Sequence, residues 1–364
     1  MPVSRAARAG YAAGMRVVVV GASGNVGTSV LAALARAPEV ESVLGIARRR
    51  PGARFPKAGW AVADIARDDL RPLFRGADAV VHLAWLIQPS RDPVTLRATN
   101  VEGSDRVFRA AGEAGVGTLV FASSVGVYSP GPKDRAVDES WPTDGIPTSF
   151  YSIHKVAAER LLDRFEREHP DTRVVRLRPG LIFKRDAASG IRRLFAGPLL
   201  PSPLVRPGLV PIVPDTPRLR FQAVHSLDVG EAYRLALTRP VRGAFNVAAD
   251  PVLDPATLGR LLDARPVPVP ARVLRRAADL SWRLRLQPTP AGWVDLALGV
   301  PLLDSSRARA ELGWRPRRDA GEALLELLEG IRESAGIDTP PLAPGAGGPA
   351  RLRELLTGVG ARST

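Results

Sequence analysis

Two side chains able to move a proton lie one helical turn apart in the segment Tyr151-Ser-Ile-His-Lys155. The pattern over residues 150–168 predicts a helix, so positions i and i+4 place the phenol and the amine on one face. A free phenol, with a pKa of about 10, exchanges protons poorly at neutral pH, and a nearby ammonium stabilises the phenolate. The pair therefore predicts that Tyr151 acts as an acid/base group that Lys155 tunes.

A pair of hydroxyl groups, Ser123 and Ser124, ends the strand-like run Thr118 to Ala122. In an open parallel sheet, ligands bind outside the carboxyl ends of the strands. The sequence therefore predicts that a serine hydroxyl lies at the same edge as the tyrosine and the lysine.

A glycine-rich loop, Gly21-Ala-Ser-Gly24-Asn-Val-Gly27, joins a valine-rich strand at 16–20 to a predicted helix at 26–37. Glycines at 21 and 24 let the chain turn tightly and let its backbone approach a pyrophosphate, which a helix N-terminus attracts. The spacing is GxxGxxG. Placed between a first strand and a first helix, it predicts a dinucleotide-binding loop.

The second predicted strand, 43–47, is followed by Arg48-Arg49-Arg50 and no acidic residue. An acid there would bind the ribose 2′-hydroxyl of NAD, whereas guanidinium groups bind a 2′-phosphate in a fork. Arg48 and Arg49 therefore favour NADP, with NAD still possible. A carboxylate follows at Asp64, beside Ile65, where we expect it either to accept a hydrogen bond from an adenine amino group or to cap the following helix.

The elements that position these residues alternate between strand and helix. Alternation over 16–178 predicts an α/β fold, a Rossmann-type doubly wound parallel sheet with a smaller, discontinuous C-terminal substrate domain. Residues 255–335 are predicted to be mostly helical. The expected organisation is a disordered tail at 1–14, a dinucleotide-binding domain at 15–180 joined by 226–248, a substrate domain at 181–225 and 249–335, and a Pro/Gly-rich tail at 336–364.

Composition excludes several classes of protein. The 364 residues carry a formal charge of +14, but the basic residues are scattered, so a nucleic-acid partner is not expected. There is no cysteine and the histidines lack metal-ligand spacing, so neither a disulfide nor a metal site is predicted. No apolar run is long enough to cross a bilayer. We expect a cytoplasmic protein with no membrane partner.

Together these motifs resemble the extended short-chain dehydrogenase/reductase superfamily, in its NAD(P)-dependent epimerase/dehydratase branch, over about residues 15–330. The resemblance rests on the order and spacing of the glycine loop, Asp64, His82-Leu-Ala84, Asn100, Ser123-Ser124, Val127-Tyr128, Tyr151 with Lys155, and Arg178-Pro179-Gly180. Two departures stand out. Phe183-Lys184-Arg185 replaces the usual aromatic-Gly-Pro, and Ser124-Val125-Gly126 lacks the Thr-Asp-Glu of sugar-nucleotide dehydratases.

The resemblance assigns roles to positions in this chain. It implies that Tyr151 is the general acid/base and that Lys155 lowers the pKa of Tyr151 and binds the nicotinamide ribose. It also implies that Ser124 forms a hydrogen bond with the reacting oxygen and that Asn100 supports Lys155 through a water molecule. The expected cofactor contacts are Gly21, Ser23, Gly24, Asn25, Val26, Gly27, Arg48, Arg49, Asp64, Ile65, Leu83, Ala84, Ser123, Tyr151, Lys155 and Pro179.

The leading expectation is an NAD(P)-dependent oxidoreductase acting on a secondary alcohol or ketone, with reduction favoured. The alternatives are a nucleotide-sugar epimerase that holds NAD tightly, and a non-catalytic regulatory protein that senses NADP. The loop residues Gln88 and Arg91 are candidate substrate contacts. Trp282, Trp293 and Trp314 either line a substrate pocket or pack in the core. By analogy with relatives, the helices at 98–114 and 150–168 are expected to pair in a homodimer.

Overall fold

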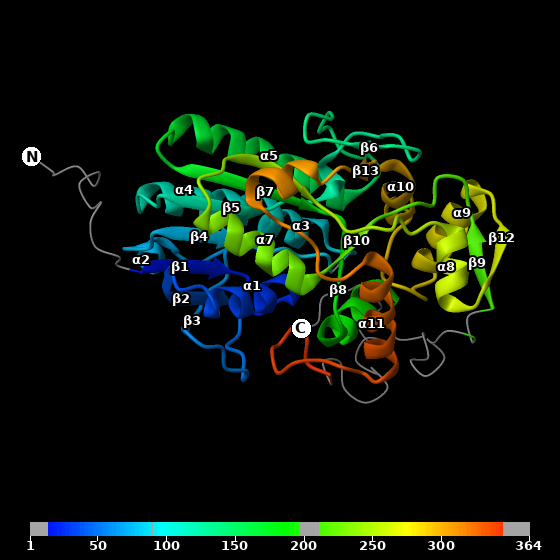
Figure 1. Cartoon of the computed structure of the whole chain (residues 1–364), viewed down its shortest axis with the longest axis horizontal. Coiled ribbons are helices and arrows are strands. Elements are labelled where there is room, and N and C mark those ends of the chain that lie inside the picture. The colour runs from blue at the N-terminus through cyan, green and yellow to red at the C-terminus, as the bar shows by residue number, and fades with distance from the viewer. Residues whose placement is uncertain (1–13, 89, 197–207, 209–210, 345–364) are drawn as a thin grey trace, which may run out of the picture.

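The computed structural model describes residues 14–88, 90–196, 208 and 211–344. The expected tails at 1–14 and 336–364 therefore lie largely outside the described residues. The central sheet consists of β1 (Met15–Val20), β2 (Val40–Ala47), β3 (Ala58–Val62), β4 (Ala79–His82), β5 (Thr118–Ala122), β7 (Arg173–Pro179) and β11 (Gly243–Val247). All seven strands are parallel, in the order β11-β7-β5-β4-β1-β2-β3, so the predicted doubly wound fold is confirmed (Figure 1).

Helices cover both faces of this sheet. They are α1 (Asn25–Ala35), α2 (Arg71–Phe74), α3 (Pro93–Arg97), α4 (Gly103–Glu113), α5 (Phe150–Glu168) and α7 (Ser226–Thr238). Alternate valines of β1 enter different cores: Val17 and Val19 pack with residues of α1 and α7, and Val18 and Val20 pack with residues of α4 and α5. A strand buried on both faces needs such a continuous apolar run, which explains the valine repeat.

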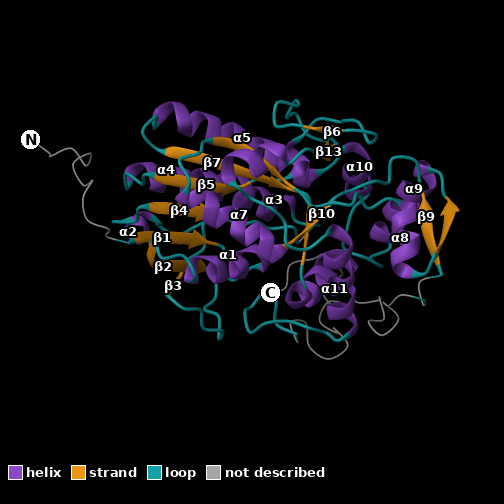
Figure 2. Ribbon diagram, viewed as in Figure 1, coloured by secondary structure: helices purple, strands orange, loops and turns teal. Residues whose placement is uncertain are grey.

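The remaining elements are shorter and lie mostly in the right half of Figure 2, and they include the segments expected to form a substrate domain, whose role stays a prediction. They are β6 (Ala136–Val137), β8 (Leu181–Phe183), α6 (Ala188–Ile191), β9 (Ile212–Asp215), β10 (Ala223–His225), α8 (Pro255–Leu262), β12 (Arg265–Pro268), α9 (Ala271–Arg283), α10 (Gly292–Gly299), β13 (Leu302–Leu303) and α11 (Ala320–Arg332). Three two-stranded sheets, β10-β8, β12-β9 and β13-β6, hold them together. The segment 255–335 is mostly helical, as expected, and it also contains the short strands β12 and β13, which the sequence did not predict.

Two predicted helices differ from the structure. The sequence pattern of 67–75 predicts a helix there, but only α2 forms, because Asp64 and Asp68 hold the preceding residues in a turn. The helix expected at 98–114 begins earlier, at Pro93, and is interrupted by a π-helical turn at Ala98–Glu102. Such turns arise where a side chain is re-aimed within a helix, and this one contains Asn100.

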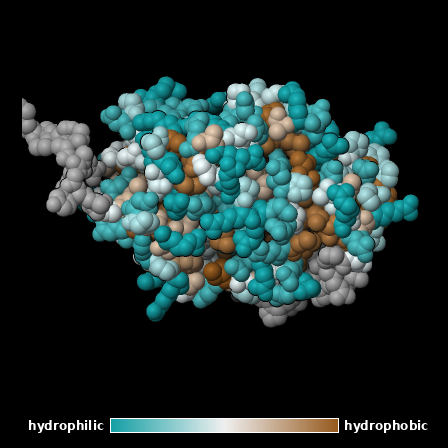
Figure 3. Space-filling model, in the orientation of Figure 1, coloured by the Kyte–Doolittle hydropathy of each residue, from teal (hydrophilic) through white to brown (hydrophobic). Residues whose placement is uncertain are grey.

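The surface is mostly hydrophilic on the face shown in Figure 3, with hydrophobic residues gathered toward the middle and right of the view. Among the described helices, none is both long enough and apolar enough to span a bilayer.

Candidate active site

The tyrosine, the lysine and the serine meet at the carboxyl edge of the sheet. Ser149 caps α5, so Tyr151 stands in the first turn and Lys155 one turn later. Ser124 follows β5, and its hydroxyl is hydrogen-bonded to the Tyr151 phenol while accepting the Gly126 N–H at 3.0 Å. The structure therefore brings the three predicted catalytic side chains together.

Burial sets the protonation of this group. It raises the pKa of Tyr151, and the hydrogen bond from Ser124 only partly opposes that rise. Burial also lowers the pKa of Lys155 well below its ordinary value. The Lys155 Nζ donates to the Ala122 carbonyl at 2.6 Å and lies 5.8 Å from the Tyr151 ring centroid. Tyr151 is therefore protonated at neutral pH, and the tuning of its pKa by Lys155 stays a prediction.

An aromatic wall surrounds the phenol. The centroid of the Trp293 ring, from α10, lies 5.1 Å from that of the Tyr151 ring, and the centroid of the Trp85 ring lies 6.1 Å from it. Phe195 packs edge-on against Trp293 at 5.0 Å. Trp85 also lies under the Lys155 Nζ, 3.5 Å from its ring centroid. The space beside the tyrosine is therefore lined by apolar rings.

Both of these tryptophans bury an N–H group that finds no acceptor among the described residues. A buried donor without a partner is costly, so each indole N–H is a candidate to bind a ligand oxygen. Of the tryptophans weighed from the sequence, Trp314 lies in the core and donates to the Asp228 carbonyl at 2.8 Å. The sequence reasoning missed Trp85, although it directly follows His82-Leu-Ala84.

Asn100 holds the loop after β4. The Asn100 side chain is fully buried. Its amide oxygen accepts a hydrogen bond from the Leu86 N–H at 2.7 Å, and its amide nitrogen donates to the Leu86 carbonyl at 2.8 Å. The same amide nitrogen lies 3.5 Å from the His154 Nδ1. These contacts fix the backbone beside Trp85. The water-linked support of Lys155 that the resemblance implies stays a prediction.

A pocket runs along the glycine loop from the ends of β1 and β2 toward Trp85. Its lining includes many of the expected cofactor contacts: Gly21, Ser23, Gly24, Arg48, Asp64, Ile65, Leu83 and Ala84. Pro341, far along the chain, closes one side. Asn25, Val26 and Gly27 begin α1 immediately beyond this loop, and Pro179 ends β7.

The three glycines of the loop are not equivalent. Gly21 has a φ of +87°, and a Cβ there would come within 2.6 Å of the Ala84 nitrogen. A Cβ on Gly27 would lie 2.5 Å from two carbonyl oxygens. A Cβ on Gly24 would instead meet only the Gly21 oxygen, at 3.5 Å, an ordinary contact. The fold requires glycine at 21 and 27 but not at 24, so the open surface at Gly24 fits the close approach of a pyrophosphate.

This difference predicts that Gly24→Ala folds normally but binds cofactor poorly. We expect its free energy of unfolding to stay within about 0.5 kcal/mol of the wild type, and its affinity for NADPH to fall at least about tenfold, or about 1.4 kcal/mol. Calorimetric titration and urea unfolding measure the two quantities. Gly21→Ala is the matched control and should lose stability. Unchanged NADPH affinity in Gly24→Ala would mean that this loop does not bind the pyrophosphate.

The arginines after β2 are exposed, and Arg48 lines the pocket whereas Arg49 does not. Among the described residues, neither side chain forms an ion pair or a hydrogen bond. Asp64 accepts the Ala66 N–H at 3.0 Å, so its carboxylate holds a turn while it lines the pocket. Arg48 is therefore the better placed of the two to bind a 2′-phosphate.

Lys184 braces the first turn of α1, a role that the sequence reasoning missed. Its buried Nζ donates to the Thr28 hydroxyl at 2.6 Å and to the Asn25 carbonyl at 3.1 Å. Burial lowers its pKa to about 8. The signal was the departure from aromatic-Gly-Pro at this position, which places a lysine against the helical turn that follows the glycine loop.

Ser123 faces away from Ser124, into a buried charged network. Its hydroxyl donates to Glu159, whose two carboxylate oxygens accept from Arg178 at 3.0 and 2.6 Å. Arg178 also donates to the Tyr128 hydroxyl at 3.1 Å. The Ser123 hydroxyl proton is committed to Glu159, and the cofactor contact that the resemblance implies for Ser123 stays a prediction.

The candidate substrate contacts Gln88 and Arg91 join the loop after β4 to the segments expected to form a substrate domain. Gln88 donates to the Leu194 and Pro288 carbonyls at 3.0 and 3.1 Å. Arg91 donates to the Trp282 carbonyl and lies 4.2 Å over the Trp282 ring. The structure uses both side chains to dock this loop, and their contact with substrate stays a prediction.

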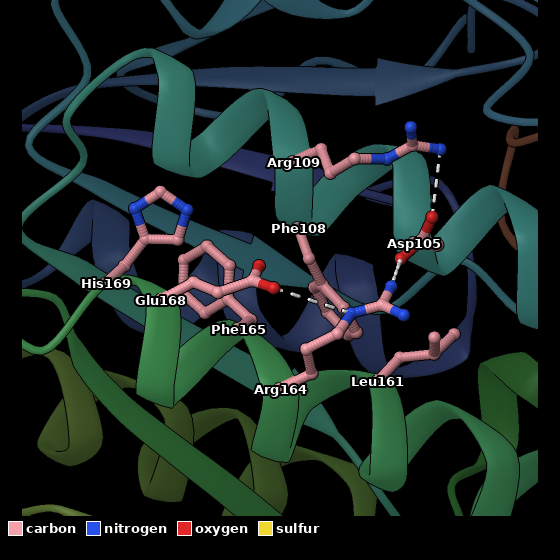
Figure 4. A pocket seen from close by; sticks show the side chains of 8 residues that line it. All are labelled: Asp105, Phe108, Arg109, Leu161, Arg164, Phe165, Glu168 and His169. Atoms are coloured by element: carbon pink, nitrogen blue, oxygen red, sulfur yellow. Dashed lines mark hydrogen bonds and ion pairs between the residues drawn. The ribbon is translucent and has the colours of Figure 1, made fainter.

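A second pocket lies between α4 and α5, on the pair of helices expected to dimerise (Figure 4). Asp105 bridges Arg109 at 2.9 Å and Arg164 at 2.7 Å, and His169 stacks on Phe165. None of the predicted catalytic residues lines it. The homodimer stays a prediction. In the described part of the chain, no group of three His, Cys, Asp or Glu side chains is arranged to hold a metal.

Comparison with known proteins agrees with this geometry. The chain is 29% identical over 327 residues to an uncharacterized protein of Mycobacterium tuberculosis, covering 89% of this chain and 31% of that protein, so it spans about a third of that relative's length. It is 27% identical over 321 residues to a Stigmatella aurantiaca ketoreductase acting on a farnesylated dihydroquinoline oxide, covering 83% of this chain and 92% of that protein.

Among solved structures, UDP-glucose 4-epimerase of Thermotoga maritima superposes with a TM-score of 0.67 at 21% identity, covering 88% of this chain and 99% of that one. At that identity the likeness concerns the fold. Residues 17–248 match the sequence model of the NAD dependent epimerase/dehydratase family. Since this match takes in the glycine loop, the serine, the tyrosine and the lysine, the chain belongs to the NAD dependent epimerase/dehydratase family.

Proposed function

We propose that the protein reduces an apolar ketone to a secondary alcohol with NADPH. The observation that carries the proposal is the aromatic wall beside the catalytic tyrosine, where the Trp85 and Trp293 rings pack against the Tyr151 ring. An apolar ketone fits such a wall. Burial raises the pKa of Tyr151, so the phenol is protonated at neutral pH and can donate to the carbonyl oxygen.

In this reaction the chain binds and orients the ketone and delivers one proton. Tyr151 donates its phenolic proton to the carbonyl oxygen, and Ser124 holds that oxygen in place. The rings of Trp85 and Trp293 exclude water from this proton transfer. A nicotinamide cofactor held by Gly21, Gly24 and Arg48 supplies the hydride when bound.

The preference for NADPH rests on Arg48. It is exposed at the mouth of the pocket, and among the described residues no acidic side chain is paired with it. A guanidinium there attracts a 2′-phosphate and offers nothing equivalent to the ribose hydroxyl of NADH.

Epimerisation of a nucleotide sugar is the second candidate, because the superposed Thermotoga structure is a UDP-glucose 4-epimerase. That chemistry uses Tyr151 first as a base and then as an acid, so the protonation of Tyr151 does not separate the two candidates. The matching ketoreductase, whose name includes a farnesyl group, fits an aromatic, apolar site better. The non-catalytic regulator is disfavoured because Ser124, Tyr151 and Lys155 stay together.

The test is an assay of NADPH consumption with a panel of aromatic and long-chain ketones, run beside UDP-glucose. The proposal expects an alcohol product formed in step with NADPH loss for at least one ketone. Conversion of UDP-glucose to its C4 epimer without NADPH consumption would overturn it in favour of the epimerase.

Trp293 gives a further prediction about this site. Trp293→Phe keeps an aromatic ring beside Tyr151 but removes the unpartnered N–H, so KM for the ketone should rise about three- to tenfold, as expected for one lost hydrogen bond. The value of kcat should change less. Trp282→Phe, which loses an N–H directed at Ser90, is the matched control and should keep the wild-type KM. An unchanged KM in Trp293→Phe would remove the indole N–H from substrate binding.

A further inference from the structure

Helix α9 exposes an apolar stripe to solvent. Val273, Leu280 and Leu284 follow one another at helical spacing, and 50%, 58% and 59% of their surface is exposed. Ala277 fills the gap between them and is exposed too. Leu286, just beyond the helix, is 46% exposed. Isolated exposed apolar residues are ordinary, but a continuous stripe along one helix marks a binding surface.

The stripe is not the face by which α9 docks on the protein. Leu274, Ala278, Ser281 and Trp282 are the less exposed positions, and they follow each other on a different side of the helix. Trp282 packs under Arg91 on this docked side. Helix α9 therefore has two apolar sides. One packs against the rest of the protein, and the other is exposed to solvent.

Arginines flank the exposed stripe. The segment 271–286 contains Arg272, Arg275, Arg276, Arg283 and Arg285 and a single acid, Asp279. Arg275 is paired with Asp295 at 2.8 Å and Arg283 with Asp279 at 2.9 Å. Among the described residues Arg272, Arg276 and Arg285 form no ion pair, so their charge is available to a partner.

We propose that α9 binds the surface of a bilayer that contains anionic lipids, lying in the interface with Val273, Leu280 and Leu284 among the acyl chains. A helix with an apolar stripe beside arginines is the form that inserts in this plane, where apolar burial and attraction to anionic headgroups act together. Basic residues near such a surface add to the attraction.

The charge of α9 favours a bilayer over a second copy of this chain as the partner of the apolar stripe. Two α9 helices packed face to face would bring their arginines together, and like charges oppose such an interface. An anionic surface complements the same arginines and the +14 charge of the chain. The expectation of no membrane partner rested on the lack of a spanning segment, which a helix lying on the surface does not need.

The position of α9 also connects the surface to the active site. The Arg275–Asp295 pair joins α9 to α10, which carries Trp293 against Tyr151. A lipophilic ketone dissolved in the bilayer would therefore reach the aromatic wall by a short path. This last step rests on the proposed function, whereas binding of α9 to the bilayer does not.

Co-sedimentation of the full chain with vesicles tests the proposal without any activity assay. We expect binding to vesicles of phosphatidylcholine with about one third phosphatidylglycerol, little binding to pure phosphatidylcholine, and loss of binding as salt is raised. Leu280→Asp/Leu284→Asp should lower the bound fraction at least about tenfold, because it buries two charges in the interface.

Two further variants keep the result decisive. Arg272→Gln/Arg276→Gln changes only exposed side chains, so it should fold normally and still weaken binding. Val94→Asp places the same charge at another exposed apolar residue, outside α9, and should bind like the wild type. No binding to anionic vesicles, or equal binding by the leucine double variant, would overturn the proposal. A wild-type dimer that the leucine variant dissociates would assign the stripe to a second copy.

Discussion

Replacing Tyr151 by phenylalanine is expected to lower kcat for ketone reduction about 10³-fold, within the range for loss of a general acid. The ring and its packing against Trp293 remain, so the free energy of unfolding and the affinity for NADPH should hardly change. Steady-state kinetics, together with NADPH titration and urea unfolding, separates these effects.

The pH dependence of reduction by the wild-type enzyme also tests whether Tyr151 donates the proton. Because burial raises the pKa of Tyr151 above that of a free phenol, reduction should not lose its proton donor until the pH exceeds about 10. Tyr128→Phe removes a buried hydroxyl that bonds Asn246 and is the matched control; it should lose stability but retain kcat. A Tyr151→Phe variant with wild-type kcat would remove this residue from the chemistry.

Removing the charge of Arg178 should be the most destabilising single change in the Rossmann part of the chain. Arg178→Met leaves the Glu159 carboxylate buried without its bidentate partner, and breaking a buried ion pair in this way costs about 3–5 kcal/mol. Arg176, 3.8 Å from the same carboxylate, compensates only in part, since it also binds Asp163 and Glu166. Urea unfolding measures the loss.

The paired variant Glu159→Leu/Arg178→Met provides the control. With both charges gone, no unpaired charge remains in this pair, so much of the lost stability should return even though the Ser123 hydroxyl loses its acceptor. In the wild type, burial alone would raise the pKa of Glu159, but its bonds with Arg178 bring it below the ordinary value. The Glu159–Arg178 pair therefore contributes its full stability above the pKa of Glu159 in the unfolded chain, about 4.3. That stability is lost as the pH falls through the lower pKa of Glu159 in the folded protein. A loss below about 1 kcal/mol in Arg178→Met would contradict this account.

The parts of the site that the sequence predicted are those set by local geometry. Tyr151 and Lys155 share a helix face because they are four residues apart, and the glycine loop directly joins a strand to a helix. Ser124 follows its strand without a break. In each case chain neighbours determine the position, so periodicity and spacing were sufficient.

The parts that the sequence did not predict depend on contacts between distant segments. Trp293 reaches Tyr151 from α10, and Lys184 reaches α1 from the loop after β8. The pKa of Tyr151 depends on how completely it is buried beside the Trp85 and Trp293 rings. The local sequence around Tyr151 does not encode this burial. The π-helical turn at Asn100 was also hidden, because its sequence fits an uninterrupted helix equally well.

The measurement that tests the central claim most directly is mass spectrometry of nucleotide released from the purified protein, followed by titration of the emptied protein with NADPH and NADH. We predict that no NAD is retained in stoichiometric amount, that NADPH exchanges freely, and that it binds at least about tenfold more tightly than NADH, a difference of about 1.4 kcal/mol. Stoichiometric retained NAD, with no preference for NADPH, would contradict a dissociable reductase and identify an epimerase that regenerates its cofactor in place.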